Sequence, residues 1–266
     1  MPLAVCATPI GNLDDVTLRV VEELRAADVV LCEDTRHTRV LLERHGISAR
    51  LLSYHEHNEE KRTSEVLPRL QAGDRFALVS DAGLPGISDP GARLVAAALA
   101  AGVPVTVLPG PSAAETALVA SGFGAERYQF LGFLPRGAKA QRALWDELAG
   151  WAHPVVAFES PQRLPATLRS LADAQPEREV AVCRELTKRF EEIVRGTARE
   201  LASRFAEAPK GEITLVLGPG VAARSDADAV AAVSELVAAG VGRRQAADVV
   251  ARLTRTPRNE LYRRTL

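Results

Sequence analysis

The sequence predicts two α/β domains followed by a small helical segment that resembles a helix-turn-helix unit. Three observations predict it. Apolar runs alternate with helical patterns over residues 1–120, a second set of strand-like runs follows a glycine-rich break at residues 121–127, and the end of the chain is helical. Such alternation is typical of a mostly parallel sheet covered by helices on both faces. We expect domains at residues 1–120 and 121–222 and a tail at 223–266.

Each strand-like run of the first half is followed by a helical pattern. We expect strands at residues 3–7, 29–34, 50–55, 76–83 and 103–110, and helices at residues 14–27, 39–46, 59–70 and 91–101 and from Ser112 onward. The second half has strand-like runs at residues 128–133, 154–160, 179–186, 190–196 and 211–218. Since the run at 190–196 directly follows that at 179–186, the two should form a hairpin, and the second sheet should be mixed. Tail helices are expected at residues 230–240, 243–254 and 257–266.

The composition is that of an ordinary globular protein. The chain has 266 residues, 47% of them hydrophobic and 25% charged, with a net charge of −1. The totals therefore give no sign of a nucleic-acid partner, and any basic surface must be local. We find no signal peptide and no membrane-spanning stretch, and we expect a cytoplasmic protein with no membrane partner. The three cysteines are far apart, which predicts buried, reduced thiols and no metal.

Four loops at the carboxyl ends of the predicted strands are rich in glycine, proline and polar residues. They cover residues 8–13, 33–37, 80–91 and 109–113. Ligands of open α/β sheets bind at this edge. Asp81 or Asp89 could accept hydrogen bonds from ribose hydroxyls or an amino group, although Asp89 in SDPG could equally be a helix N-cap. Ser112 begins a helix, where free N–H groups suit a carboxylate. The loops predict a zwitterionic, nucleoside-containing ligand.

Other nucleotide and hydrolase motifs are missing from the sequence. It has no G-x-G-x-x-G fingerprint, no phosphate-binding G-x-x-x-x-G-K-[ST] loop and no G-x-S-x-G elbow. His55 and His57 lie in a polar stretch before a helix, where a loop or cap role is the expected one, so we predict no metal site.

The tail carries a local excess of arginine. Between Gly242 and the end of the chain only Asp248 and Glu260 oppose this charge. A solvated helical face is the ordinary interpretation, but the contrast with a neutral chain favours contact with RNA. The candidate RNA-binding residues are Arg243, Arg244, Arg252, Arg255, Arg258, Arg263 and Arg264.

Long motifs in a fixed order identify a resemblance. They are ATPIGNLDDVTLR, LCEDTRHTRVLLERHGI, LVSDAGLPGISDPG, LPGPSA, FLGFLPR, FESPQRL, CRELTKRFEEIVRG and GEITLVL. Together they resemble the ribosomal small-subunit RNA cytidine 2′-O-methyltransferases, a branch of the tetrapyrrole-methylase superfamily. The resemblance implies two α/β domains of the tetrapyrrole-methylase type with S-adenosyl-L-methionine in the cleft between them, and a homodimer. It also implies methylation of a decoding-centre cytidine (cytidine 1402) of 16S rRNA in the small ribosomal subunit.

The same motifs imply the residues that touch the cofactor. They are Pro9, Gly11, Asp81, Ala82, Gly83, Leu84, Pro85, Ile87, Ser88, Ser112 and Ala113 in the first domain and Phe158, Glu159 and Leu186 in the second.

Transfer of a methyl group to a hydroxyl needs alignment of oxygen, methyl and sulfur, and a base or cation that helps the hydroxyl lose its proton. The candidates are Asp34, Arg36, His37, Glu159, Glu185 and Lys188. We predict that Asp34, Arg36, Glu159 and Lys188 are essential, without assigning the base. Arg36 and Lys188 could instead bind phosphate, and an ion pair between Glu185 and Lys188 could be purely structural.

Two other functions compete with RNA methylation. A tetrapyrrole C-methyltransferase would need an open, largely apolar trough, whereas this chain has arginine-bearing loops and an arginine-rich tail. A non-catalytic RNA-binding module would use the tail alone, but it would have no need for the cofactor loops.

Overall fold

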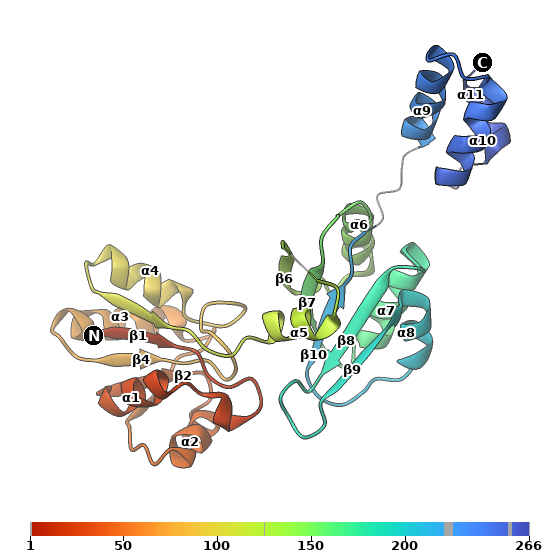
Figure 1. Cartoon of the computed structure of the whole chain (residues 1–266). Helices are drawn as coiled ribbons and strands as arrows, with labels where there is room; N and C mark the ends of the chain where they lie inside the picture. The colour runs from red at the N-terminus through yellow and green to blue at the C-terminus, as the bar shows by residue number, and fades with distance from the viewer. Residues whose placement is uncertain (1, 125, 221–225, 255–256, 266) are drawn as a thin grey trace. The chain divides into compact units, whose positions relative to one another are not determined.

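The first half of the chain forms a five-stranded parallel sheet with the strand order β3-β2-β4-β1-β5 (Figure 1). The computed structural model describes residues 2–124, 126–220, 226–254 and 257–265. The strands are β1 (Leu3–Cys6), β2 (Val29–Cys32), β3 (Leu51–Ser53), β4 (Phe76–Leu78) and β5 (Val105–Leu108). The helices are α1 (Leu18–Ala26), α2 (Thr35–Arg44), α3 (Glu59–Gln71), α4 (Ala92–Ala100) and α5 (Ala113–Ser121), with a short 3-10 helix η1 (Leu13–Asp15).

Helices cover both faces of this sheet because alternate strand residues point to opposite sides. Leu3 and Val5 pack with α3 and α4 on one face. Ala4 and Cys6 pack with α1 and α2 on the other. All four side chains are buried, so the strand reads as a continuous apolar run. This arrangement brings the carboxyl ends of β1, β2 and β4, and the loops after them, to one edge of the sheet.

The second half forms a mixed five-stranded sheet with the order β6-β7-β10-β8-β9. Only β6 and β7 are parallel, and β8 and β9 form the predicted hairpin. The strands are β6 (Gln129–Phe133), β7 (Val155–Glu159), β8 (Glu179–Arg184), β9 (Glu192–Thr197) and β10 (Ile213–Leu217). The helices are α6 (Ala138–Leu148), α7 (Leu164–Ala174) and α8 (Ala198–Arg204). The mixed sheet and the hairpin are therefore confirmed.

Helix α5 follows the last strand of the first sheet but packs against the second sheet. Ala114 and Ala117 lie in one buried cluster with Val156 of β7 and Cys183 of β8. Small side chains let a helix approach a sheet closely, and α5 is rich in alanine. The connection β5–α5 therefore brings the loop at Ser112 next to residues of the second sheet.

Two local expectations of the sequence were wrong. The first helix does not begin at residue 14: Asn12 caps η1, and Thr17 then starts α1 by accepting a hydrogen bond from the N–H of Val20. Asp89 is not a helix N-cap either. Helix α4 begins after Gly91, whose φ of 136° suits only glycine, so Asp89 lies before the turn that starts the helix.

Within residues 226–254 and 257–265 the tail forms the three predicted helices, α9 (Asp226–Ala238), α10 (Arg243–Thr254) and α11 (Arg258–Arg264). Val233, Ala246, Val250 and Leu261 form their shared buried core. The chain divides into one compact unit of Met1–Ala143 with His153–Pro219 and another of Leu144–Ala152 with Gly220–Leu266. The three-domain division expected from the sequence stays a prediction.

Candidate functional site

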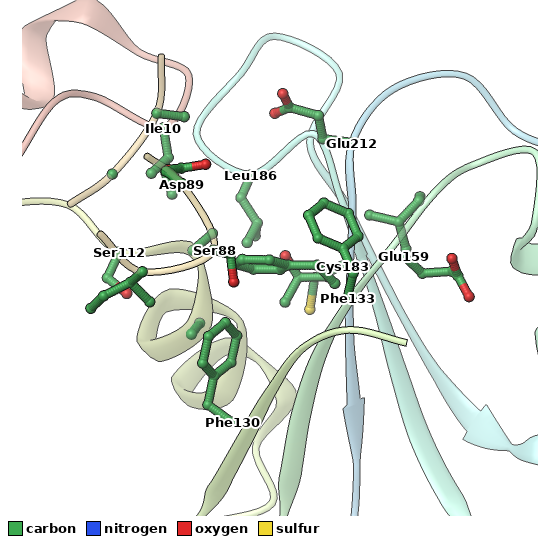
Figure 2. A pocket seen from close by; sticks show the side chains of 18 of the residues that line it. Ile10, Ser88, Asp89, Ser112, Phe130, Phe133, Glu159, Cys183, Leu186 and Glu212 are labelled. Atoms are coloured by element: carbon green, nitrogen blue, oxygen red, sulfur yellow. The ribbon is translucent and has the colours of Figure 1, made fainter. Parts of the chain in front are cut away.

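A large cavity opens in the first unit, at the carboxyl edge of the parallel sheet (Figure 2). Its volume is about 780 Å³, which lies in the range of small-molecule sites. Residues from the β1, β4 and β5 loops and from β6, β7 and β8 line it. Most of the residues expected to touch the cofactor are among them, namely Ala82, Gly83, Leu84, Ile87, Ser88, Ser112, Ala113, Phe158, Glu159 and Leu186.

Backbone hydrogen bonds clamp the first and third of these loops together. The N–H of Thr8 donates to the carbonyl of Gly83 at 2.8 Å, and the N–H of Gly83 donates back at 3.1 Å. The Thr8 hydroxyl donates to the carbonyl of Ser80 at 3.0 Å. Gly83 has a φ of 80°, a conformation that L side chains rarely adopt. The wall of the cavity is therefore fixed by the backbone before any ligand binds.

The other expected cofactor residues, Pro9, Gly11, Asp81 and Pro85, do not line the cavity among the described residues. Gly11 instead packs against the loop after β8: a Cβ at this position would lie 2.7 Å from the carbonyl oxygen of Leu186. Asp81 accepts a hydrogen bond from the N–H of Asp34 at 3.2 Å, through Oδ1. Gly11 and Asp81 therefore shape the loops around the cavity.

Three acidic residues meet next to the cavity, at the ends of β2 and β4. The N–H of Asp81 donates to Glu33 Oε1 at 3.3 Å. Burial raises the pKa of Glu33 to about 7, the charges of Asp89 and Asp81 add to this, and the hydrogen bond from Asp81 opposes it. Burial also raises the pKa of Asp89 to about 6, against a hydrogen bond from Ser80. Sequence reasoning missed Glu33, although it is the first residue of the EDTRH motif.

Asp34 and Arg36 lie at the start of α2 and bind each other. Asp34 caps the helix through the N–H of Arg36 at 2.8 Å, and it accepts hydrogen bonds from the guanidinium at 3.1 and 2.7 Å. The Arg36 side chain is 88% exposed. Hydrogen bonds from Arg36 hold the pKa of Asp34 well below its usual range, so its carboxylate is a poor proton acceptor. His37 is exposed beside them.

The carboxylate of Glu159 is fully buried and points away from the cavity (Figure 2). It accepts hydrogen bonds from the Thr167 hydroxyl at 2.6 Å and the Ser160 N–H at 2.7 Å. Arg163 forms an ion pair with both of its oxygens, at 3.0 and 3.1 Å. Its lone pairs are thus occupied, and Glu159 holds the end of β7 in place.

Lys188 lies between two carboxylates, 3.0 Å from Glu185 and 2.8 Å from Glu212. Burial lowers the pKa of Lys188, but its hydrogen bonds to both carboxylates outweigh this and raise it overall. The backbone here is strained: Glu185 and Thr187 have φ values of 52° and 64°. Such conformations persist only where the surroundings enforce them, and they cluster at functional sites. Glu185 and Glu212 line the cavity, whereas Lys188 does not.

A second hydrogen-bonded group, which the sequence did not reveal, lines the cavity at the start of α5. Glu115 accepts hydrogen bonds from the hydroxyls of Ser112 and Tyr128. The hydrogen bond to Glu115 raises the pKa of Tyr128 to about 12, and burial adds to this. Tyr128 comes from a different element, so only the folded chain brings it to Glu115.

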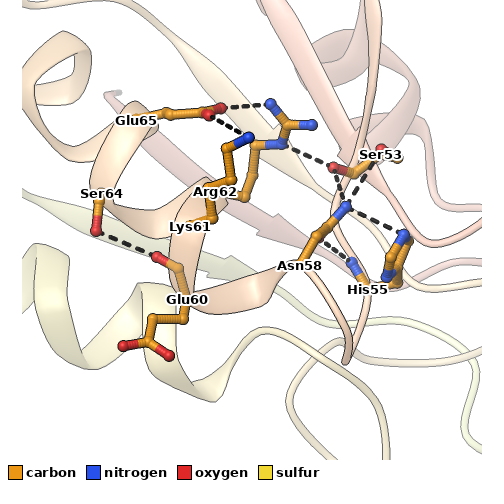
Figure 3. Close-up of polar contacts among 8 residues, drawn as sticks. All are labelled: Ser53, His55, Asn58, Glu60, Lys61, Arg62, Ser64 and Glu65. Carbon is orange, nitrogen blue, oxygen red and sulfur yellow. Dashed lines mark hydrogen bonds and ion pairs between the residues drawn. The ribbon is translucent and has the colours of Figure 1, made fainter.

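His55 and His57 bind no cluster of further ligands. Asn58 Oδ1 accepts a hydrogen bond from the N–H of His55 at 2.9 Å, and its amide contacts Ser53 and the His55 ring (Figure 3). The network braces the turn before α3. Within the part of the chain that the structure describes, no group of three or more acidic, histidine or cysteine residues could hold a metal ion. All three cysteines are buried.

The candidate RNA-binding arginines of the tail differ in their partners. Arg258 forms an ion pair with Asp248 at 3.2 Å, and Arg264 pairs with Glu260 at 3.5 Å. Arg244, Arg252 and Arg263 are exposed and pair with no carboxylate of the described residues, and Arg243 is half-buried. Arg255 lies outside the described residues. No described helix is both long and apolar enough for a bilayer span.

Comparison with known proteins identifies the family. The sequence matches the tetrapyrrole (corrin/porphyrin) methylases over residues 2–202. Ribosomal RNA small subunit methyltransferase I of Mesorhizobium japonicum is 45% identical over 99% of this chain and 91% of its own. The protein of that name from Synechocystis sp. is 42% identical over 99% of this chain and 97% of its own. A solved uroporphyrin-III C-methyltransferase from Thermus thermophilus, complexed with S-adenosylhomocysteine, shares the fold, with a TM-score of 0.56, 19% identity, and coverage of 81% of this chain and 96% of its own. The chain therefore belongs to the ribosomal RNA small subunit methyltransferase I family, within the tetrapyrrole methylases.

Proposed function

We propose that this protein transfers a methyl group from S-adenosyl-L-methionine to the 2′-hydroxyl of cytidine 1402 of 16S rRNA, in the small ribosomal subunit. One observation carries the proposal beyond family membership: most of the residues expected to touch the cofactor line a single cavity. The relatives, which are ribosomal RNA small subunit methyltransferases, supply the class of acceptor.

The residues of the cavity fit such a cofactor. Helix α5 begins at Ser112 without a side-chain cap, so its first N–H groups can receive the cofactor's carboxylate. Asp89 and Glu115 can accept hydrogen bonds from an amino group or ribose hydroxyls. Leu84, Ile87 and Leu186 offer apolar surface to the adenine, while Gly11 and Asp81 hold the loops in shape and Pro9 and Pro85 lie in those loops. When bound, S-adenosylmethionine supplies an activated methyl group on a positive sulfur.

The chain's own residues then have to align the acceptor and remove its proton. The 2′-oxygen forms the new bond to the methyl carbon as the carbon–sulfur bond breaks, and the hydroxyl proton passes to a base. Lys188, held by Glu185 and Glu212, would stabilise negative charge on the hydroxyl oxygen or on a neighbouring phosphate. Arg36, exposed beside Asp34, would bind a phosphate. Glu159 acts as a positioning residue for β7.

Binding of the subunit would draw on the tail. Arg243, Arg244, Arg252, Arg255, Arg258, Arg263 and Arg264 would contact phosphates, which position an RNA without reading its sequence. We also propose a cytoplasmic homodimer. Residues 1–120 and 121–222 would serve as the two catalytic domains and residues 223–266 as the RNA-contacting domain.

A methyl-transfer assay tests the proposal. Purified protein and radiolabelled S-adenosylmethionine are incubated with small subunits that lack the modification, with free 16S rRNA, or with a tetrapyrrole, and the products are mapped by nuclease digestion and mass spectrometry. We expect one methyl group on the ribose of cytidine 1402, in subunits. Transfer to the tetrapyrrole, or to a base instead of a ribose, would contradict the proposal.

A further inference from the structure

Three phenylalanines form an aromatic corner on the β6–β7 side of the cavity, made of Phe130, Phe133 and Phe158. Figure 2 labels Phe130 and Phe133. The ring of Phe158 lies edge-on to the other two, with centroid distances of 5.0 Å to Phe130 and 5.6 Å to Phe133. Edge-to-face contact is the favoured geometry of aromatic pairs and fixes the orientation of the rings. The corner is thus a rigid part of the cavity wall.

A bulge in β6 puts both of its phenylalanines on the same side. Phe130 pairs with Val156 and Phe133 with Phe158, so three steps along β6 match two steps along β7. Residues an odd number of steps apart point to opposite faces of a regular strand, and the extra residue cancels this alternation. Gly132 supplies the bulge with a φ of 65°. Without it, Phe133 would point to the other face of the sheet.

The bulge also brings β6 against the loop after β4. A Cβ at Gly132 would lie 3.1 Å from the Ser88 hydroxyl oxygen, so the glycine permits a close approach. Ser88 is one of the expected cofactor contacts and has a φ of 63°. The aromatic corner therefore borders the cofactor loops but is built from separate elements.

The ring of Phe133 is left open to the cavity: it is 61% exposed. An exposed aromatic ring in the wall of a largely apolar cavity marks a place where a ligand packs. Ser160 and Gln162 follow Phe158 along the chain and also line the cavity, and the Ser160 hydroxyl donates to the amide oxygen of Gln162 at 2.9 Å. The Gln162 amide N–H groups remain able to donate to a base edge.

We propose that Phe133, supported by Phe158, is the stacking surface for the base of the acceptor nucleotide. This inference rests on the proposed function and deepens it. Proteins that recognise single-stranded RNA splay its bases out and stack them on aromatic rings, and enzymes with an enclosed site hold an extruded nucleotide in the same way. Because a phenyl ring reads only the flat face of a base, Gln162 would supply the contact to its edge.

Phe133→Ala tests the inference. Loss of one base–aromatic stack should raise KM for small subunits at least about fivefold, while the cofactor affinity measured by calorimetry stays at the wild-type value. Phe133→Trp should keep the wild-type KM, and Phe133→Leu, which keeps apolar volume without a ring, should behave like Phe133→Ala. Phe190→Ala is the matched control, because Phe190 is 66% exposed and does not line the cavity.

The outcomes separate this inference from the function on which it rests. If wild-type protein fails to methylate small subunits, the proposed function fails. If the wild-type protein methylates them and either Phe133→Ala or Phe133→Leu has the wild-type KM, the inference that Phe133 stacks on the base is wrong. A loss of cofactor affinity in Phe133→Ala with an unchanged KM for subunits would place the ring in the cofactor site and overturn the inference. Circular dichroism confirms that each variant is folded.

Discussion

Two clusters of acidic residues in the first unit differ in whether a cation accompanies them. Glu33 and Asp89, at the edge of the parallel sheet, are partly buried and form no ion pair with a described residue, and their pKa values are raised to about 7 and 6. Glu185 and Glu212, in the mixed sheet, share the ammonium of Lys188. Burial alone would raise the pKa of Glu185, but the N–H of Glu212 and the charge of Lys188 lower it overall.

The difference concerns what each group can do. A carboxyl whose pKa lies near neutrality can take up and release a proton under working conditions. A paired carboxylate stays ionised and serves to fix a cation in place. The first group therefore suits proton transfer and the second suits charge positioning, so their variants should respond differently to pH.

The largest effect should come from breaking the ion pairs of the second group. Lys188→Met removes the ammonium that joins Glu185 and Glu212, and we expect kcat/KM to fall about 100-fold and stability to fall by about 1–3 kcal/mol. Lys188→Arg should retain part of the rate. Lys210→Met is the control, since Lys210 is exposed and its ammonium pairs with no described carboxylate. A folded Lys188→Met protein with wild-type activity would remove Lys188 from the mechanism.

The next largest effect should come from a substitution at Gly11, where the loop after β1 contacts the loop after β8. In Gly11→Ala the new Cβ would lie 2.5 Å from Lys188 Cγ and 2.7 Å from the carbonyl oxygen of Leu186, and that backbone atom cannot move cheaply. We expect a loss of about 2 kcal/mol of stability, together with weaker cofactor binding. Thermal unfolding and calorimetry measure the two effects. Gly137→Ala, at a position with no atom within 4 Å of the new Cβ, should change neither.

The acidic residues of the parallel sheet should affect the pH dependence of the free energy of unfolding. A raised carboxyl pKa means that the folded state holds more protons, so the stability that Glu33 contributes is full below its unfolded pKa and is lost as pH rises through about 7. Glu33→Gln should therefore stabilise the protein above pH 7, by about 1 kcal/mol after allowance for solvent screening. Denaturant unfolding at a series of pH values checks this. An unchanged pH dependence between 5 and 8 would mean that Glu33 is not desolvated.

The architecture of the molecule was largely predictable from its sequence. Continuous apolar runs predicted buried parallel strands, and the closeness of residues 179–186 to 190–196 predicted the hairpin. The predictions that failed concerned the residues at which helices begin. Helix α4 begins after a turn at Gly91 and not at Asp89, and no sequence pattern specifies the φ of that glycine.

The candidate site was predictable in its loops but not in its side-chain partners. The geometry of parallel sheets places the loops at one edge, so the loop at residues 80–91 and Ser112 were found from position. The family resemblance supplied single contacts such as Gly83. Glu115 with Tyr128, and Phe133 with Phe158, come from separate elements and meet only through tertiary packing. Glu159 was expected to contact the cofactor and to be essential for the reaction. Its buried partners instead hold its carboxylate away from the cavity, and a sequence motif does not show such burial.

The smallest effect should distinguish the tail arginines from one another. Arg244 is exposed without a described carboxylate partner, whereas Arg258 is paired with Asp248. An arginine already neutralised within the protein gains less from a phosphate, because it must give up or share its partner. Arg244→Ala should therefore weaken binding of small subunits about threefold near 0.15 M salt and lower the salt slope by about one, while Arg258→Ala changes both less. Filter binding over a range of salt concentrations measures both quantities. Equal losses in the two variants would show that the pairing with Asp248 does not persist on RNA, and no loss in either would place the RNA-binding surface outside α10 and α11.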